Sequence, residues 1–418
     1  MNPDCVIGNN TTITKAVIIV AGSGTRMFPL TKNRSKVMLP LANRPLLWHI
    51  LTSVAKAGVR DFVLVVQDGA ADIRQYFGDG SDFGISIQYA VQKEQLGTAH
   101  AIYCARDFVN GAFIVLNGDV LFNTSDIVPL LSSSNTSGNA VVCAFETNDV
   151  SQFGILELGS VPDNASGNMP DIVNLVEKPA YHDSNLANAG IYLFPESVFD
   201  EIKVTGKSQR GEYEITDTII TMIKKGRVQC HKLNFWMDVG RPWDLLAAND
   251  HLLKTVQYEI KGDVEEGAVL KGDVAVGSGT VIRSGAYIIG PVVIGNNCII
   301  GPNCFIRPST TLGNHVHIGN GVEVKNSIVM DNTNIGHLSY VGDSVIGTGC
   351  NFGAGTKVAN LRHDGKTIRM MVKGKLVDTG RRKLGVIMAD GVHTAINTSV
   401  NTGVVLERDT MLGEVVLH

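Results

Sequence analysis

The residues best suited to phosphate chemistry lie close together near the start of the chain. Gly22 and Gly24 follow an apolar run, and Arg26 and Lys36 come shortly after them. Glycine lets backbone N–H groups approach a polyphosphate closely, and the two cations add positive charge. The third glycine of a Gly-x-Gly-x-x-Gly fingerprint is absent, and so is the Gly-Lys-Ser/Thr ending of a P-loop. The pattern predicts a phosphate-binding loop of another kind.

The segment Val20–Pro40 resembles the signature of the sugar-phosphate nucleotidyltransferases. In that chemistry the phosphate of a sugar 1-phosphate attacks the α-phosphorus of a nucleoside triphosphate and pyrophosphate leaves. The resemblance implies that Arg26 and Lys36 are catalytic and neutralise the developing charge. It also implies nucleotide-binding roles for Gly22, Gly24, Thr25, Gln92, Gln95, Gly97 and Thr98.

Two aspartates in the same half of the chain are candidate metal ligands. Asp119 follows the apolar run Phe113–Leu116, which places its carboxylate at the carboxyl end of a strand, and Asp238 ends the sequence Trp236-Met-Asp238. By the same resemblance this pair holds Mg²⁺, which prefers oxygen ligands and bridges phosphates. The resemblance further implies a sugar-binding group made of Gly154, Glu177, Lys178 and Asn188.

The elements that position these residues follow an α/β pattern. Short β-branched runs occur at Ala16–Ala21, Phe62–Val66 and Phe113–Leu116. They are typical of buried parallel strands, and Leu46–Ala57 has the spacing of a helix. This order predicts a Rossmann-like, doubly wound sheet whose ligand crevice lies at the carboxyl ends of the strands.

The second half of the chain follows a hexapeptide period. Aliphatic residues recur at every sixth position from Val264 to Met330, twelve in succession. This period predicts a parallel β-helix, and the repeat resembles the hexapeptide acyltransferases, whose β-helix is left-handed. We expect the period to break by one residue before Ile335 and a polar insertion, at about Lys357–Lys383, to leave the coil. The predicted domains are an extension (1–14), a nucleotidyltransferase domain (15–245), a connector (246–263) and a β-helix acetyltransferase domain (264–418).

Where the period breaks, Gly336-His337-Leu-Ser-Tyr340 and the polar residues after it resemble an acetyltransferase site. The family is that of the bifunctional N-acetylglucosamine-1-phosphate uridyltransferases, and the insertion is more like its archaeal members. By this resemblance His337 is the general base that deprotonates the glucosamine amine. The resemblance assigns the sugar phosphate and acetyl-CoA to Arg307, Lys325, Tyr340, Asn351, Ala354, Asn360 and Lys366. Because the family's sites form between neighbouring helices, it also implies a homotrimer.

The resemblance implies a bifunctional enzyme that acetylates glucosamine 1-phosphate with acetyl-CoA and couples N-acetylglucosamine 1-phosphate to UTP. One alternative is a glucose-1-phosphate thymidylyltransferase, acting with dTTP, whose β-helix is structural. Another is a non-enzymatic subunit of the translation-initiation exchange factor. Proteins of that class tend to lose the loop cations and metal carboxylates, which are all present here.

Composition excludes several other classes. The 36 basic and 40 acidic residues give a net charge of −4, which provides no basic field for nucleic acid. The apolar run Ala16–Ala21 is too short to span a membrane. The 7 cysteines are scattered without a Cys-x-x-Cys pair, as expected of reduced thiols in a cytoplasmic protein.

Overall fold

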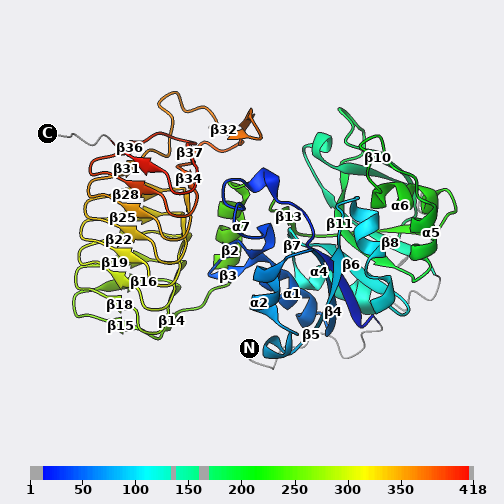
Figure 1. Cartoon of the computed structure of the whole chain (residues 1–418), viewed down its shortest axis with the longest axis horizontal. Helices are drawn as coiled ribbons and strands as arrows, with labels where there is room; N and C mark the ends of the chain where they lie inside the picture. The colour runs from blue at the N-terminus through cyan, green and yellow to red at the C-terminus, as the bar shows by residue number, and fades with distance from the viewer. Residues whose placement is uncertain (1–12, 133–137, 160–168, 414–418) are drawn as a thin grey trace. The chain divides into compact units, whose positions relative to one another are not determined.

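The computed structural model describes residues 13–132, 138–159 and 169–413 (Figure 1). The chain divides by its internal contacts into two compact units, Met1–Ser23 with Leu47–Asp238, and Gly24–Leu46 with Val239–His418. These limits differ from the predicted domains, because the segment Gly24–Leu46 packs within the unit that contains the β-helix. The predicted extension, residues 1–14, lies outside the described residues except for its last two.

The first unit is built on a mixed sheet with β1 (Lys15–Ile19) at its centre. β1 pairs in parallel with β4 (Asp61–Gln67) on one side and β6 (Phe113–Asn117) on the other. β5 (Ser86–Gln92) continues the parallel part beyond β4. These strands confirm the predicted α/β sheet. They read as continuous apolar runs because helices cover both faces of such a sheet.

Antiparallel pairing extends the sheet beyond β6. β11 (Leu186–Phe194) pairs with β6 and also contacts β8 and β9. The remaining strands of this sheet are β8 (Ala140–Glu146), β9 (Gly154–Leu158), β10 (Ile172–Glu177) and β12 (Val228–Lys232). A separate two-stranded ribbon joins β7 (Val120–Phe122) to β13 (Trp236–Asp238).

Helices accompany the strands of this sheet. The first, α1, spans Leu46–Lys56, and its apolar Leu47, Ile50 and Val54 are buried at helical spacing, as predicted. The others are α2 (Ala71–Phe77), α3 (Thr98–Tyr103), α4 (Thr124–Ser132), α5 (Val198–Val204) and α6 (Ile215–Ile223). Short 3₁₀ turns occur at Ser81–Phe83, Arg106–Phe108 and Val150–Gln152.

The second unit contains a β-helix with three faces, each a parallel sheet (Figure 1). The first face consists of β14 (Glu259–Ile260), β17 (Val274–Val276), β20 (Val292–Ile294), β23 (Thr310–Leu312), β26 (Ile328–Val329), β29 (Val345–Ile346), β34 (Ile387–Met388) and β37 (Val405–Leu406). The second consists of β15 (Asp263–Val264), β18 (Val281–Ile282), β21 (Ile299–Ile300), β24 (His317–Ile318), β27 (Asn334–Ile335), β30 (Asn351–Phe352), β35 (His393–Thr394) and β38 (Met411–Leu412). The third consists of β16 (Val269–Lys271), β19 (Tyr287–Ile289), β22 (Phe305–Ile306), β25 (Glu323–Lys325), β28 (Tyr340–Gly342), β31 (Lys357–Val358) and β36 (Ser399–Val400). The predicted hexapeptide β-helix is thus confirmed.

The coil register shows where the hexapeptide period changes. Ile294 pairs with Leu312, 18 residues on, so that three hexapeptides make one coil. Leu312 pairs with Val329, 17 residues on, which puts the break earlier than the predicted position before Ile335. Met330, the twelfth member of the predicted period, is therefore out of register. The cause is a corner between β25 and β26 that contains one residue fewer than the corner between β22 and β23.

The polar insertion leaves the coil slightly later than predicted. Lys357 and Val358 still pair with neighbouring coils, and the chain rejoins the first face at Ile387. Between them lies a hairpin of β32 (Arg369–Val372) and β33 (Lys375–Asp378). The base of the insertion is closed where the Leu384 backbone N–H donates to the Asn360 carbonyl over 3.0 Å.

A helix and a loop segment pack on the β-helix within the second unit. α7 (Asp244–Leu253) is fixed by Asn249, which is fully buried. The Asn249 Oδ1 atom accepts hydrogen bonds from Thr311 Oγ1 and the Ala42 N–H, both over 2.9 Å. Ala42 lies between β2 (Pro40–Leu41) and β3 (Arg44–Pro45), which follow the 3₁₀ turns Thr25–Met27 and Lys36–Met38.

None of the described helices has both the length and the apolar composition that crossing a membrane requires. The cysteines of the described residues are free thiols, and five of these six are buried. Burial raises the pKa of Cys230 and of Cys350 to about 11, so both thiols stay protonated near neutral pH.

Candidate functional site

Within the second unit, Gly24 of the predicted phosphate loop lies close to Thr31 and Lys36. Gly24 has a φ of 61°, and a Cβ placed there would lie 3.2 Å from Lys36 Cβ. The Thr31 hydroxyl donates to the Gly24 carbonyl over 2.9 Å. Arg26 is exposed on the turn that starts at Thr25, while Lys36 is partly buried. The left-handed backbone and close approach explain why glycine occupies position 24.

The first unit holds the other part of the glycine-rich segment. Gly22 follows β1, is exposed, and a Cβ there would meet no described atom within 4 Å. The carbonyl of the preceding Ala21 accepts hydrogen bonds from Gln67 Nε2 over 2.5 Å and Gln95 Nε2 over 3.0 Å. Gln95, a predicted nucleotide-binding residue, therefore also holds the end of the central strand.

The segment from Gln92 to Thr98 is fixed against the start of α6. Gln92 is buried, and its Nε2 atom donates to the Gly97 carbonyl over 3.0 Å. Gly97 has a φ of 113°, and a Cβ there would lie 2.4 Å from the Tyr213 carbonyl oxygen. The Thr98 hydroxyl accepts the Ile215 N–H over 2.9 Å. These contacts fix the conformation of the predicted base-binding segment.

The two predicted metal ligands are brought together by the β7–β13 ribbon. Asp238 pairs with Val120, the residue that follows Asp119. The Trp236 indole holds β13 to β11 by donating to the Ala189 carbonyl over 2.7 Å. No cluster of three or more His, Cys, Asp or Glu ligands occurs among the described residues. A carboxylate pair still fits Mg²⁺, because protein sites for this ion commonly supply one or two carboxylates and leave the rest to phosphates and water.

The predicted sugar-binding residues also converge. Gly154 pairs with Glu177, and a Cβ on Gly154 would lie 3.0 Å from Glu177 Oε2 and 3.9 Å from Asn188 Cβ. Lys178 adopts a φ of 46°, and its Nζ atom lies 3.5 Å from Glu177 Oε1. Arg210, which the sequence did not single out, contacts Glu177 Oε1 over 3.3 Å. It arrives from a loop remote in sequence, so no local motif marks it.

In the second unit, several of the predicted acetyltransferase residues lie at two corners of the β-helix. We call the corner that joins the third face to the first face the third corner. It carries Arg307 and Lys325, which stand at equivalent places on successive coils, and Asp343, whose backbone N–H donates to the Lys325 carbonyl over 2.9 Å. This corner is where the coil loses a residue and where the insertion departs.

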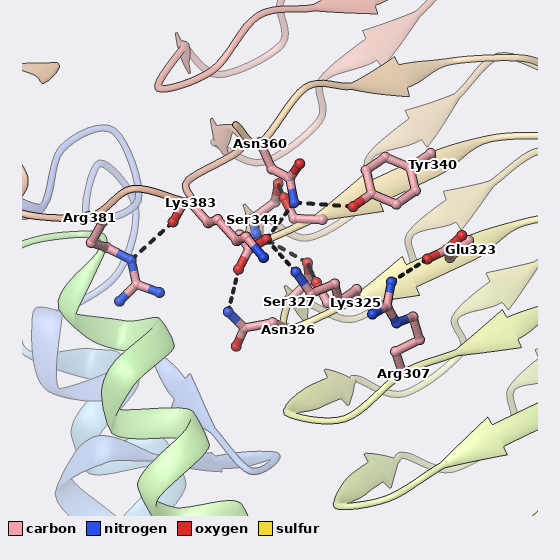
Figure 2. A network of polar contacts seen from close by, with 12 residues as sticks. Arg307, Glu323, Lys325, Asn326, Ser327, Tyr340, Ser344, Asn360, Arg381 and Lys383 are labelled. Carbon is pink, nitrogen blue, oxygen red and sulfur yellow. Dashed lines mark hydrogen bonds and ion pairs between the residues drawn. The ribbon is translucent and has the colours of Figure 1, made fainter. Parts of the chain in front are cut away.

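Figure 2 shows a polar network at the third corner that includes Lys325, Asn326 and Asn360. The side chains of these three residues all donate to the carboxylate of Asp343. The carboxylate is 3% exposed and accepts Lys325 Nζ over 3.2 Å. It also accepts the Nδ2 groups of Asn326 over 2.6 Å and of Asn360 over 2.5 Å. Its φ of 51° is one that Asp and Asn tolerate better than other side chains. Sequence reasoning gave Asp343 no role, because its partners come from two other coils, one before and one after its own.

Tyr340, the first residue of β28, joins the same network through its hydroxyl group. Its hydroxyl accepts Asn360 Nδ2 over 3.1 Å. A Cβ on Gly342 would lie 2.5 Å from the Tyr340 hydroxyl, so the ring lies over the glycine. Burial, followed by the charges of Asp343 and Glu323, raises the pKa of Tyr340. The phenol therefore keeps its proton and can donate it to a ligand.

A cavity of about 500 Å³ opens beside the third corner. α7 lines one side, with Leu246, Ala247 and Asp250, and the corner residues and Arg381 of the insertion line the rest. Arg307 Nη1 pairs with Glu323 Oε1 over 2.9 Å at its edge. The volume is within the range of small-molecule sites. Cations together with carboxylate and amide groups suit a ligand that carries both a phosphate and hydroxyl groups.

The second corner, which joins the second face to the third, carries His337 and Ala354. His337 is exposed between β27 and β28. Ala354 follows on the next coil, where the Gly355 N–H donates to the His337 carbonyl over 2.7 Å. Asn351 lies on the second face, and Lys366 is exposed on the insertion. Because β28 separates the two corners, one chain does not bring His337 beside Lys325.

Comparison with known proteins identifies the family. A family model described as nucleotidyl transferase matches residues 15–255, and one described as the GMPPB C-terminal domain matches residues 288–416. The chain is 40% identical to the bifunctional protein GlmU of Methanococcus maripaludis over 95% of this chain and 93% of that protein. The chain belongs to the bifunctional GlmU family.

Two further relatives define this GlmU-family chain more closely. It is 37% identical, over 93% of each chain, to a bifunctional sugar-1-phosphate nucleotidylyltransferase/acetyltransferase of Sulfurisphaera tokodaii. Among solved structures, a protein from Bacillus anthracis assigned as a glucose-1-phosphate thymidylyltransferase matches with a TM-score of 0.52 and 30% identity. That match covers 97% of the Bacillus protein but 59% of this chain.

The GlmU relatives extend through both units, so the predicted two-part enzyme is confirmed. The chain is a nucleotidylyltransferase joined to an acetyltransferase on a left-handed β-helix. The thymidylyltransferase resemblance is partial, and the non-enzymatic alternative is not supported.

Proposed function

We propose that this GlmU-family enzyme acetylates glucosamine 1-phosphate with acetyl-CoA and couples N-acetylglucosamine 1-phosphate to UTP. The observation that carries the proposal is the third-corner cavity, which Arg307, Lys325 and Asp343 line. Asp343 also accepts a hydrogen bond from Asn360, which in turn donates to Tyr340. A structural β-helix has no need of a cavity lined by cations. Because the full-length relatives are bifunctional, both activities belong to one chain.

In the nucleotidyltransferase half, catalysis is positioning and charge neutralisation. Arg26 and Lys36 neutralise the triphosphate while the sugar phosphate attacks the α-phosphorus. Asp119 and Asp238 would hold Mg²⁺, which would supply a Lewis acid at the phosphates. The Glu177 carboxylate would accept hydrogen bonds from sugar hydroxyls, and the Asn188 amide would accept or donate them. The incoming phosphate oxygen is already ionised, so no side-chain nucleophile is required.

In the acetyltransferase half, the amine of glucosamine 1-phosphate attacks the thioester carbonyl of acetyl-CoA. His337 removes the amine proton, the new amide bond forms, and the CoA thiol leaves with a proton. Arg307 and Lys325 hold the sugar phosphate by charge-assisted hydrogen bonds. Tyr340 and Asn360 orient the sugar, and the backbone near Ala354 contacts acetyl-CoA. Lys366 and Asn351 complete the predicted binding set.

We further propose that the acetyltransferase site forms between chains of a homotrimer. Placement of His337 at the second corner and Lys325 at the third supports this, since the two residues act on one substrate. Mixing His337→Ala and Lys325→Ala chains under conditions that exchange subunits should then restore part of the activity. Subunits that exchange without any recovery would show that the site lies within one chain.

The proposed function is tested by two assays on the same protein. Thiol release from acetyl-CoA should require glucosamine 1-phosphate and should vanish in His337→Ala. Pyrophosphate release from UTP and N-acetylglucosamine 1-phosphate should vanish in Asp119→Asn, which keeps the shape of the side chain. Each variant should keep the other activity near the wild-type level. Wild-type protein that releases pyrophosphate, from UTP or dTTP, without any thiol release would reduce the β-helix to a scaffold.

A further inference from the structure

Arg381 differs from the other cations of the third-corner cavity in having no carboxylate of its own. Arg307 pairs with Glu323 over 2.9 Å and Lys325 with Asp343 over 3.2 Å. Arg381 makes no ion pair within 4 Å with any residue that the structure describes, although it is partly buried. Figure 2 shows its side chain beside the helix, linked by one hydrogen bond, 3.4 Å long, from Nε to the Lys383 carbonyl.

The backbone of Arg381 is held firmly, so the side chain is presented from a fixed point. The Ile368 N–H donates to the Arg381 carbonyl over 2.8 Å, and Ile368 is 1% exposed. The Arg381 N–H donates to the Thr379 hydroxyl over 3.2 Å, and that hydroxyl donates to the Ile368 carbonyl over 2.7 Å. The insertion thus anchors Arg381 at the cavity and leaves both terminal guanidinium nitrogens available for a ligand.

The charges that line the cavity leave an excess of positive charge. Its cations are Arg307, Lys325 and Arg381, and its carboxylates are Asp250 and Asp343. Asp250 is already engaged, because it accepts the Ser309 hydroxyl over 2.5 Å and lies 3.3 Å from Lys254. Burying a cation without an anion is costly, and an anionic ligand would offset that cost. Burial correspondingly lowers the pKa of Arg381, against the charges of Asp343, Asp244 and Asp250.

We propose that Arg381 is a third ligand of the phosphate group of the acetyl acceptor, beside Arg307 and Lys325. This rests on the proposed acetyltransferase function of the same cavity. A guanidinium can make two parallel hydrogen bonds to phosphate oxygens, which an ammonium cannot. The insertion therefore contributes a binding residue that the hexapeptide coils do not contain. Acceptors without a phosphate should not benefit from it.

The test compares Arg381→Met with Arg381→Lys and with Arg382→Met as a matched control. Arg382 is exposed on the same insertion, and its Nε donates to the Gly365 carbonyl over 3.1 Å. Glucosamine 1-phosphate is titrated calorimetrically into each full-length protein without acetyl-CoA. Lys325→Met, in the same cavity, measures any binding of this sugar phosphate elsewhere in the chain.

We expect Arg381→Met to weaken binding at least tenfold, Arg381→Lys to weaken it less, and Arg382→Met to stay within twofold of wild type. In thiol-release assays Arg381→Met should raise the KM for glucosamine 1-phosphate, with the KM for acetyl-CoA unchanged. The rate with unphosphorylated glucosamine should not change. Pyrophosphate release serves as the measure of an intact fold.

Unchanged affinity in Arg381→Met would overturn the proposal, including the case in which thermal stability falls and Arg381 is only structural. Equal losses for phosphorylated and unphosphorylated acceptors would overturn it as well. Phosphate-dependent binding that Arg381→Met abolishes, in a protein that releases no thiol, would support Arg381 as a ligand and refute acetyl transfer. The two proposals therefore fail in distinguishable ways.

Discussion

Replacing Asp343 with Asn tests whether the third-corner network depends on a buried charge. The substitution keeps a side chain that tolerates the φ of 51° at this position. It also keeps the size and one carbonyl oxygen. It removes the charge that faces Lys325, and it turns an NH₂ group toward donors that now have no acceptor. The expected loss is therefore electrostatic and not steric.

The magnitude follows from the contacts that change. A hydrogen bond to a charged group contributes about 1.5–3 kcal/mol, and a buried donor left without an acceptor costs about 1–3 kcal/mol. The lower ends apply because Lys325 is 18% exposed toward the cavity, and together they give about 2.5 kcal/mol. For a unit of about 200 residues this lowers Tm by about 5–10 °C. The KM for glucosamine 1-phosphate should also rise, because Lys325 and Asn360 lose their common anchor.

Calorimetry and circular dichroism of the full chain would measure the change. Asp409→Asn is the matched control, since Asp409 has a φ of 57° and is exposed. That control should shift Tm by less than about 2 °C, as surface substitutions usually change stability by at most about 0.5 kcal/mol. If Asp343→Asn unfolds within 2 °C of wild type, the buried pair contributes no net stability and the reasoning fails.

Two further predictions concern the second unit. Burial raises the pKa of Asp244 to about 6, although the Arg241 N–H and the charges of Arg241 and Lys36 lower it. Because the folded state holds this proton more tightly than the unfolded state, the contribution of Asp244 to stability falls as pH rises from about 4 to about 6. The free energy of unfolding of Asp244→Asn should therefore rise by about 3 kcal/mol relative to that of wild type over that interval. A difference in the free energy of unfolding between the two proteins that does not vary with pH would contradict this. Gly342→Ala should displace the Tyr340 hydroxyl from Asn360, which removes one hydrogen bond. The KM for glucosamine 1-phosphate should then rise about fivefold, which corresponds to about 1 kcal/mol, with little change in Tm. If the KM stays equal to that of the control Gly206→Ala, the Tyr340–Asn360 hydrogen bond does not serve binding.

The sequence alone determined the two architectures. Buried parallel strands must be apolar along their whole length, which made β1, β4 and β6 recognisable. The β-helix repeats one short unit, so its aliphatic period is visible without any partner. Asp119 and Asp238 were predicted as a pair by resemblance, and the ribbon that joins β7 to β13 places them in adjacent positions.

Only the tertiary structure decided what surrounds those residues. Asp343 collects donors from Lys325 and Asn360 because coils of 17 residues stack corner upon corner, a relation that no local spacing displays. Arg381 reaches the same corner because the insertion begins and ends there. The register break was placed too late from sequence because Met330 is aliphatic by coincidence, while Val329 pairs with Leu312. Local periodicity specifies which residues face the core, whereas the stacking of distant coils decides which polar side chains meet outside it.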